Sequence, residues 1–313
     1  MSVIFRNESR PDLAEAIRTD YTADYLFPKV FPAINVYEEA GQIAVATKEA
    51  VTADTNRDYD ADLTLNHYGN TAVNFAVNSY ESRVAVSDSD LKLKGDDLNI
   101  IQPELANAAA EAAVGEMEIA AASALYENAT EAVNLTTAAP LAGIAEAAYK
   151  VAPYGQPTLV CSQKFLTSLI SKPAFNEPIL KLFGEGVITG LIGGAEAVMQ
   201  SVGGWMGLPG GILVGKDAFW AEVAGESSSL DMPGFVVALR PEMRDPARAY
   251  WTAKAKATLG ATLTFLPRDR EGTPWYADTV YLPGPRINAV DVGIKAVPKV
   301  FNAGAIAKVA FGD

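Results

Sequence analysis

The sequence contains a single cysteine and a single histidine among 313 residues, and this scarcity excludes several classes of protein. Cys161 alone cannot form an intrachain disulfide or a zinc site built from cysteines. Its apolar neighbours predict a buried, unreactive thiol. His67 lies in a polar turn and is the only histidine that a Ser-His-Asp triad could use. We interpret it as a surface residue.

Long apolar runs and nucleotide-binding loops are also absent. No stretch of about 18 apolar residues predicts a membrane span, and the opening MSVIFRNESRPD lacks the apolar core of a secretory signal. Gly190–Gly193 is not preceded by a strand and followed by a helix, as a dinucleotide fingerprint requires. The acidic run that starts at Asp54 has Tyr59 where a calcium loop needs glycine. We therefore expect no catalytic residue, no metal and no cofactor.

Negative charge is concentrated in one half of the chain. The net charge of −13 divides into −14 for residues 1–156 and +1 for residues 157–313. An acidic surface repels phosphate, so this distribution argues against a dedicated nucleic-acid-binding protein. It is compatible with a wall that merely surrounds nucleic acid.

The most prominent positive feature is a helical stretch from Gln102 to Thr130, which is rich in Ala, Glu, Met and Leu. Pro103 suits the first turn of a helix, where its missing N–H is not needed. Small residues form a smooth stripe along this helix, so it can lie flat on a sheet. The stripe has no cluster of inward polar groups.

The first 50 residues are predicted to form an extended arm. Asp12–Arg18 is predicted as a short helix, whereas Pro28 and Pro32 favour extended backbone around them. An arm this apolar and irregular would not be stable alone. We expect it to pack on another part of the chain or on a neighbouring subunit.

Residues 51–83 are polar and rich in strand-forming residues, which predicts a projecting hairpin. Its strands are expected around Leu63–Leu65 and Ala72–Val77, with a turn at His67–Asn70. A hairpin of this composition cannot bury a core of its own. Its acidic strand is interpreted as part of a subunit boundary, with Arg57 and Arg83 as local charge partners.

The region after the long helix shows a strand-then-helix rhythm that indicates a compact second domain. The predicted elements are a helix at Leu141–Tyr149, a strand at Thr158–Val160, a helix capped by Ser162, and strands at VMQSV (198–202) and Ile212–Val214. Before the long helix, a short strand at 84–86 leads into an acidic turn. The glycine-rich loop that carries Trp205 and Met206 is expected to be exposed and to mark a contact surface.

Strict alternation of apolar and polar residues from Trp251 to Phe265 predicts a strand roughly 50 Å long. A strand of that length matches the long helix and is expected to lie beside it. Val280–Leu282, Ile287–Val300 and Ala303–Phe311 are predicted to add further strand segments.

The order of these elements resembles the Hong Kong 97-like fold of tailed-bacteriophage major capsid proteins. The ending YLPGPRINAVDVGIKAV resembles the last strands of such proteins. The resemblance implies an α+β fold divided into an N-arm (1–50), an E-loop hairpin (51–83), a P-domain strand and spine helix (84–132), an A-domain (133–238) and P-domain return strands (239–313). The C-terminal strands could rejoin the A-domain.

The resemblance implies assembly rather than catalysis. Hexamers and pentamers of the chain would form an icosahedral shell around double-stranded DNA, in a virion assembled in the host cytoplasm. Implied partners are other copies of the chain, with a separate scaffolding protein, a portal and a decoration protein as further candidates; no membrane is implied. The candidate inter-subunit contact residues are Arg57, Asp58, Asp60, Asp62, Tyr68, Trp205 and Met206.

Two alternatives stay open at this stage. An encapsulin-type nanocompartment would use the same fold, although the proline-rich arm differs from the helical N-terminus expected there. A soluble α/β enzyme is the other, disfavoured by the single histidine. The family's variations add two expectations. Scaffolding would be a separate protein or absent, because the arm begins at Met1, and lysine cross-linking from residues 51–83 is not expected, because they contain no lysine.

Overall fold

The computed structural model describes residues 6–10, 12, 14, 26–31, 33–36, 40–47, 69–93, 98–215, 233–239, 262–267, 275–282, 287–300 and 302–312. Several predictions concern segments outside these residues. They are the turn residue His67, the acidic run 54–62, the strand at 63–65 and most of the alternating stretch 251–265. Within the predicted short helix, Asp12 and Ala14 are described, and both are helical.

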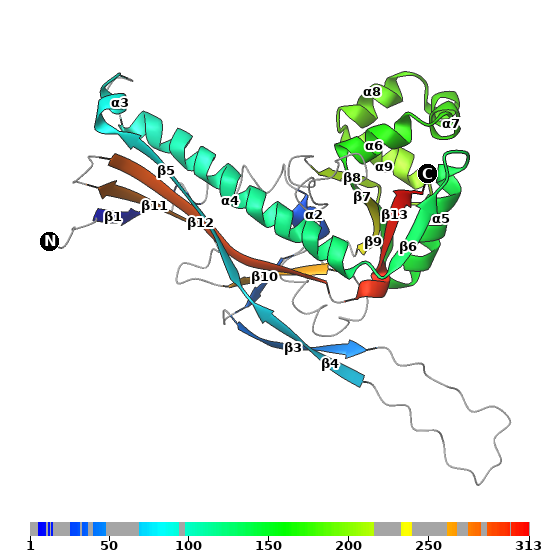
Figure 1. The fold of residues 1–313 in the computed structure, drawn as a ribbon, viewed down its shortest axis with the longest axis horizontal. Helices are drawn as coiled ribbons and strands as arrows, with labels where there is room; N and C mark the ends of the chain where they lie inside the picture. The colour runs from blue at the N-terminus through cyan, green and yellow to red at the C-terminus, as the bar shows by residue number, and fades with distance from the viewer. Residues whose placement is uncertain are drawn as a thin grey trace, which may run out of the picture.

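Helix α4 (Leu98–Asn128) is the long helix that the sequence predicts. Its 31 residues span about 46 Å (Figure 1). It begins four residues earlier than expected, so the prediction that Pro103 lies in the first turn is wrong. Pro103 lies inside the helix and has no N–H to donate to the carbonyl of Asn99. The predicted stripe of small residues is confirmed, with Ala106, Ala110, Ala113, Met117 and Ala121 all buried.

A long sheet lies along this helix, and its central strand is β12 (Ile287–Val300). β5 (Asn78–Ser87) runs antiparallel along one edge of β12. β11 (Trp275–Leu282) and β10 (Thr262–Pro267) pair antiparallel with successive parts of the other edge. At about 3.3 Å per residue, the 14 residues of β12 also span about 46 Å.

Helix α4 packs against β12 and β5. The side chains of β12 that belong to the shared core are Val290, Val292, Ile294 and Ala296. They alternate along the strand, as expected for one face of a sheet. β12 therefore takes the place beside the helix that the sequence assigns to Trp251–Phe265. The described part of that predicted strand is β10, which pairs with the end of β12.

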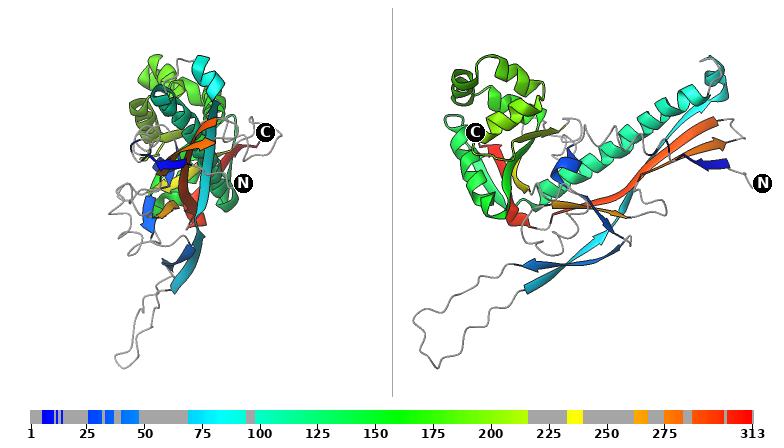
Figure 2. Two further views of the ribbon diagram at one scale, coloured as in Figure 1. Left: turned by 90° about the vertical axis from the view of Figure 1, so that its left-hand side faces the viewer. Right: turned by 180° about the vertical axis from the view of Figure 1, so that it is seen from behind.

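A five-stranded sheet in the order β6-β13-β9-β7-β8 forms the core of a second unit. Its strands are β6 (Glu131–Leu135), β7 (Gln156–Ser162), β8 (Ile212–Gly215), β9 (Gly234–Leu239) and β13 (Ile306–Phe311). The helices that surround it are α5 (Pro140–Val151), α6 (Gln163–Ile170), α7 (Pro173–Phe183), α8 (Gly186–Ile192) and α9 (Glu196–Trp205). Figure 2 shows this unit at one end of the long helix, with the C-terminal strand inside its sheet.

Several elements of this unit agree with the sequence. Ser162 caps α6 as predicted, since its side chain accepts a hydrogen bond from the Phe165 N–H. Cys161 is buried in β7, as its neighbours indicate. The strand predicted at VMQSV is wrong, because those residues lie in α9. The buried Met199, Val202 and Gly203 follow helical spacing there.

Two further elements differ from the prediction. Strand β6 follows α4, where no strand is predicted. The acidic segment after β5 is not a turn but a short helix, α3 (Asp88–Leu93). Negative residues are favourable in a first helical turn, and Asp88 and Asp90 occupy that turn.

The described parts of the N-terminal arm pack on the chain's own body. β1 (Arg6–Ser9) pairs with β11, and β2 (Ala33–Val36) pairs parallel with β10. Between them lies α2 (Phe27–Val30), a single helical turn. The prediction that the prolines forbid a helix is wrong here, because Pro28 lies in the first turn, where proline is tolerated.

A two-stranded ribbon projects from the body (Figure 1). We call β3 (Ala40–Thr47) and β4 (Gly69–Ala76) together the ribbon. The predicted turn at 67–70 is wrong for its last two residues, because Gly69 and Asn70 already pair in β4. The partner of β4 is β3 rather than a strand at 63–65.

Candidate assembly surfaces

The seven predicted contact residues divide into two groups in the structure. The first five, Arg57, Asp58, Asp60, Asp62 and Tyr68, lie outside the described residues. Trp205 ends α9 and Met206 follows it, and the prediction that they are exposed is wrong. Met206 is 6% exposed, and Trp205 packs partly buried against the core with its ring edge-on to Phe183 at 6.4 Å. Their apolar character serves packing within the second unit.

Large apolar side chains are instead exposed on the neighbouring helices. Leu182 and Phe183 end α7, and Ile192 ends α8. Their exposed fractions are 60%, 40% and 50%. Both helices lie on the side of the second unit that faces away from the ribbon (Figure 1). Large apolar side chains with this much exposure are candidates for contact with another molecule. Sequence reasoning missed these residues because their helical positions resemble core positions.

The ribbon is the other candidate contact surface. Within the described part of the chain, β3 and β4 form a two-stranded sheet without a third strand. Asn74 and Ala76 are exposed, and Phe75, near the end of β4, is buried. A two-stranded hairpin is marginally stable by itself in water. Contacts with another molecule would stabilise it.

The face of the long sheet opposite α4 carries paired charges. Arg83 on β5 stands directly opposite Asp291 on β12 and donates two hydrogen bonds to its carboxylate. This bidentate pair raises the pKa of Arg83 above its ordinary value, chiefly through the hydrogen bonds. The sequence identifies Arg83 as a charge partner but places its acids in residues 51–83. The observed partner is 208 residues away in the sequence.

A second polar contact crosses the same face. The Tyr276 hydroxyl on β11 reaches over β12 to Glu81 on β5. Gly293 lies between them on β12, paired with Tyr276 on one side and Glu81 on the other. Hydrogen bonds from Ser79 and then Tyr276 lower the pKa of Glu81. Burial, followed by the contact with Glu81, raises the pKa of Tyr276.

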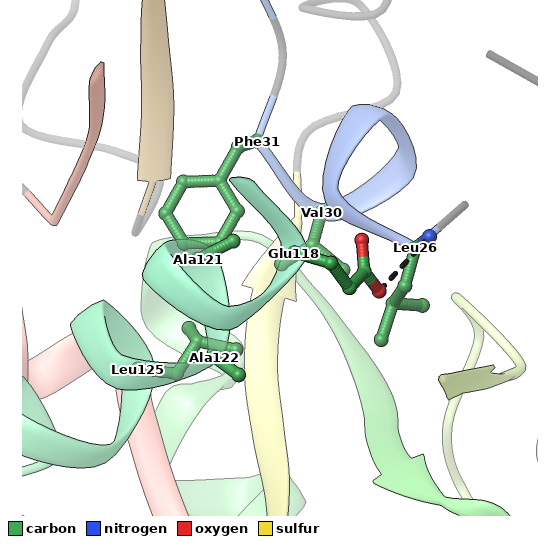
Figure 3. Close-up of a pocket in the computed structure, with 7 residues that line it drawn as sticks. All are labelled: Leu26, Val30, Phe31, Glu118, Ala121, Ala122 and Leu125. Atoms are coloured by element: carbon green, nitrogen blue, oxygen red, sulfur yellow. Dashed lines mark hydrogen bonds between the residues drawn. The ribbon is translucent and has the colours of Figure 1, made fainter. Parts of the chain in front are cut away.

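One carboxylate lies on the buried side of α4, where the sequence predicts no cluster of inward polar groups. Glu118 is 2% exposed and accepts a hydrogen bond from the Leu26 N–H at 3.2 Å (Figure 3). The burial of Glu118 could have been predicted from the sequence, because Glu118 lies one helical turn from Val114 and from Ala122 on the apolar side of the helix. Both of those residues are buried.

Among the residues that the structure describes, no three histidine, cysteine, aspartate or glutamate side chains gather as a metal site would require. Within the same residues, no helix has the length and apolarity needed to cross a membrane.

No model of a protein family matches the sequence, and no curated protein matches it either. Solved structures do match. A virus-like particle protein from Pyrococcus furiosus has a TM-score of 0.53 at 12% identity, covering 96% of this chain and 98% of its own. The capsid protein of Cyanophage P-SCSP1u has a TM-score of 0.56 at 11% identity, covering 92% and 88%. The chain has the Hong Kong 97-like capsid fold.

An encapsulin also matches the chain. An encapsulin from Synechococcus elongatus PCC 7942 has a TM-score of 0.53 at 10% identity, covering 90% of this chain and 85% of its own. Near-complete coverage in both directions means that the whole chain, and not one half of it, shares the fold.

Proposed function

We propose that the chain is the major capsid protein of a tailed phage and assembles as hexamers and pentamers into an icosahedral shell around double-stranded DNA. The observation that carries the proposal is the match of the complete chain to capsid and virus-like particle structures. The chain's own surfaces support it, since the ribbon and the exposed apolar residues of α7 and α8 are suited to contacts between copies. Many weak interfaces then add up through closed symmetry.

The proposal assigns a role to each part. Residues 84–132 and 239–313 form the P-domain around α4 and β12, and residues 133–238 form the A-domain, which β13 joins. The E-loop comprises residues 51–83 together with its first strand, Ala40–Thr47, and the preceding residues form the N-arm. Exposed Leu182, Phe183 and Ile192 of the A-domain meet neighbouring copies around each capsomer axis.

The acidic surface agrees with a wall that surrounds DNA without gripping it, because like charges keep the packaged phosphates away from the protein. The role is structural and not enzymatic, and the site of action is the virion. Separate scaffolding, portal and decoration proteins are the proposed partners.

The second candidate is an encapsulin-type nanocompartment shell, which the Synechococcus elongatus match favours. The proline-rich arm was the sequence argument against it. The arm nevertheless contains helical residues, namely α2 and the helical Asp12 and Ala14, so it differs less from a helical N-terminus than the prolines indicate. The content of the particle separates the two candidates.

The test is to purify the full-length chain and examine it by cryo-electron microscopy and analytical ultracentrifugation. Closed icosahedral particles are the expected result. A single small species at every concentration would overturn the shell function. Particles isolated from the native source should contain nuclease-protected double-stranded DNA of uniform length. A stoichiometric enclosed protein in place of DNA would favour the nanocompartment.

A further inference from the structure

Glu118 is buried within α4. A carboxylate that is taken out of water must be compensated by hydrogen bonds. Part of that compensation comes from the Leu26 N–H in the arm, at 3.2 Å. The Leu26 carbonyl meanwhile accepts from the N–H groups of Lys29 and Val30 and so begins the turn of α2. Glu118 thus holds the residue from which α2 starts.

Apolar contacts surround this hydrogen bond. Leu26, Val30 and Phe31 of the arm are 5%, 1% and 1% exposed. Figure 3 shows them gathered around Glu118 on the side of α4 that carries Ala121 and Ala122. The two alanines leave room for the larger arm side chains to approach the helix. The arm is therefore attached here by one polar contact inside an apolar cluster.

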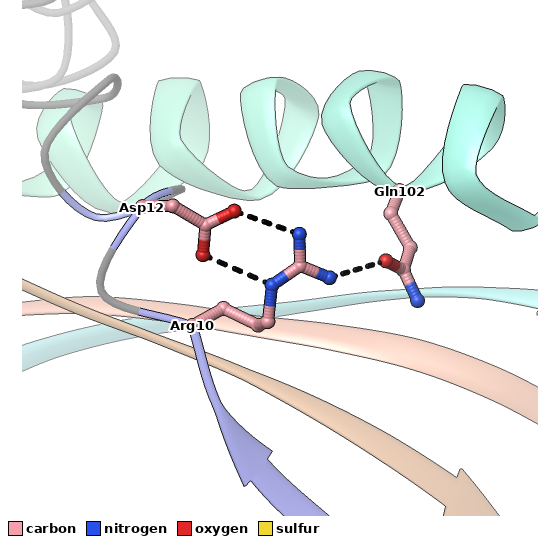
Figure 4. Close-up of polar contacts among 3 residues, drawn as sticks. All are labelled: Arg10, Asp12 and Gln102. Carbon is pink, nitrogen blue, oxygen red and sulfur yellow. Dashed lines mark hydrogen bonds and ion pairs between the residues drawn. The ribbon is translucent and has the colours of Figure 1, made fainter.

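The arm has a second attachment point further along the same helix. Arg10 donates one hydrogen bond to the Gln102 side chain at 2.7 Å and two to Asp12 at 3.0 and 2.8 Å (Figure 4). Its backbone N–H also donates to the carbonyl of Ala277 in β11. Both side-chain contacts to α4 join residues that are 92 positions apart. Gln102 and Glu118 lie 16 residues apart on α4, so the two attachment points are about 24 Å apart along the helix.

The ribbon continues directly from this attached arm. After Phe31 the chain forms β2, which pairs with β10, and β3 begins four residues after β2 ends. The other strand of the ribbon, β4, is separated from β5 by Val77 alone. One strand of the ribbon is thus held by the arm and the other by the long sheet. A shift of the arm along α4 would turn the first strand against the second.

We infer that Glu118 is a positioning residue that holds the arm on α4 and thereby sets the direction in which the ribbon leaves the subunit. This inference rests on the proposed function, because the ribbon's direction matters only where a neighbouring copy receives it. Loss of the Glu118 contact should loosen the ribbon at its base without unfolding the A-domain. The shells that form should then vary in curvature.

Two matched pairs of variants test this in the full-length chain. Glu118→Leu removes the acceptor, whereas Glu118→Gln keeps a carbonyl oxygen for the Leu26 N–H. Leu26→Pro removes the donor, whereas Leu26→Ala shortens the side chain and keeps the donor. Because the second pair leaves α4 untouched, it still decides the question if Glu118→Leu fails to fold.

The readouts are hydrogen exchange of the unassembled chain and the size distribution of particles by cryo-electron microscopy. Glu118→Leu and Leu26→Pro should speed exchange in residues 26–47 and 69–76 by about tenfold or more, with β7 and β9 unchanged, and should broaden the distribution of particle diameters. The Gln control should stay near the wild type, and Leu26→Ala, which trims a buried side chain but keeps the donor, should speed exchange less than Leu26→Pro. Unchanged exchange in the ribbon for both donor and acceptor variants, with uniform particles, would overturn the inference.

Hydrogen exchange is measured on the unassembled chain, so it tests the effect of Glu118 on the ribbon even if the wild-type chain forms no particle. Such a failure would reject the proposed shell function while leaving the effect of Glu118 on the ribbon measurable. A uniform rise of exchange throughout the chain would show a merely structural role and would also reject the inference.

Discussion

Arg83 and Asp291 are 208 residues apart in the sequence and face each other across β5 and β12, joined by two hydrogen bonds of 2.5 Å. The Arg83 side chain is 53% exposed and that of Asp291 is 22% exposed. The pair therefore lies in a partly solvated setting, where water and salt weaken the attraction.

We expect Arg83→Ala to lower the free energy of unfolding by at most about 1 kcal/mol. The exchanged double variant Arg83→Asp with Asp291→Arg should recover part of that loss, because the cross-strand geometry accepts either order. Urea denaturation of the wild type, Arg83→Asp, Asp291→Arg and the double variant measures the energetic coupling between the two positions. A loss well above 1 kcal/mol would mean that the contact is more shielded from water than these exposures indicate.

Gly293 is predicted to resist substitution because the Tyr276 ring crosses directly over it. A Cβ added at this position would fall well inside van der Waals contact with the ring carbons and hydroxyl of Tyr276. Gly293→Ala should lower the free energy of unfolding by about 1–3 kcal/mol through overpacking.

Gly204 is the matched control, because a Cβ added there meets no atom within 4 Å and the residue lies in α9. Gly204→Ala should raise stability by roughly 0.5 kcal/mol, since alanine is the better helix former. Equal effects at the two glycines in thermal denaturation would contradict the role of Tyr276.

The pKa shifts of Glu81, chiefly from the Ser79 hydrogen bond, and of Tyr276, chiefly from burial, predict loss of stability at both extremes of pH. The lowered pKa of Glu81 favours its charged form in the folded state, so its contribution is present above the ordinary value of 4.5. It is lost as the pH falls through the lowered pKa. The raised pKa of Tyr276 favours the neutral hydroxyl. Its contribution is present below the ordinary value of 10.0 and is lost as the pH rises beyond it.

The measurement is the urea midpoint as a function of pH from about 3 to about 11. Glu81→Gln should reduce the dependence on the acid side, and Tyr276→Phe should reduce it on the alkaline side. If neither substitution changes its own side of the profile, the shifts in pKa do not contribute to stability as argued.

The exposed apolar residues of α7 and α8 predict a separation between folding and assembly. Replacing Leu182 and Ile192 together by serine should leave the thermal midpoint of the isolated chain nearly unchanged, because solvent-exposed positions contribute within about 0.5 kcal/mol. The same variant should assemble poorly, since the proposed contact would lose its apolar side chains.

Sedimentation velocity of wild type and variant at matched concentrations measures the effect on assembly. Tyr149 on α5 provides a control, because it is also exposed, at 83%, but lies on a different helix. Tyr149→Ser should assemble as the wild type does. Normal assembly of the Leu182 and Ile192 variant would remove these helices from the proposed interface.

Local residue preferences are enough to predict several of the secondary-structure elements of this protein from its sequence alone. The composition of residues 102–130 predicts α4, because alanine, glutamate, methionine and leucine favour a helix wherever it packs. The side-chain oxygen of Ser162 predicts the start of α6 for an equally local reason. The runs Val280–Leu282, Ile287–Val300 and Ala303–Phe311 predict the end of β11, β12 and β13. The order of these elements then sufficed for the resemblance to a capsid fold.

Only the tertiary structure decided which elements meet. Strand pairing joins distant residues, so no local pattern shows that β12 lies between β5 and β11 or that β4 pairs with β3. Packing also overrode local preference, since VMQSV is helical in α9 and Pro28 lies in the single turn of α2. The burial of Glu118 and the exposure of Leu182 depend on what covers each helix. Which segment packs over each helix is determined by contacts between residues far apart in the chain, and local sequence patterns do not report such contacts.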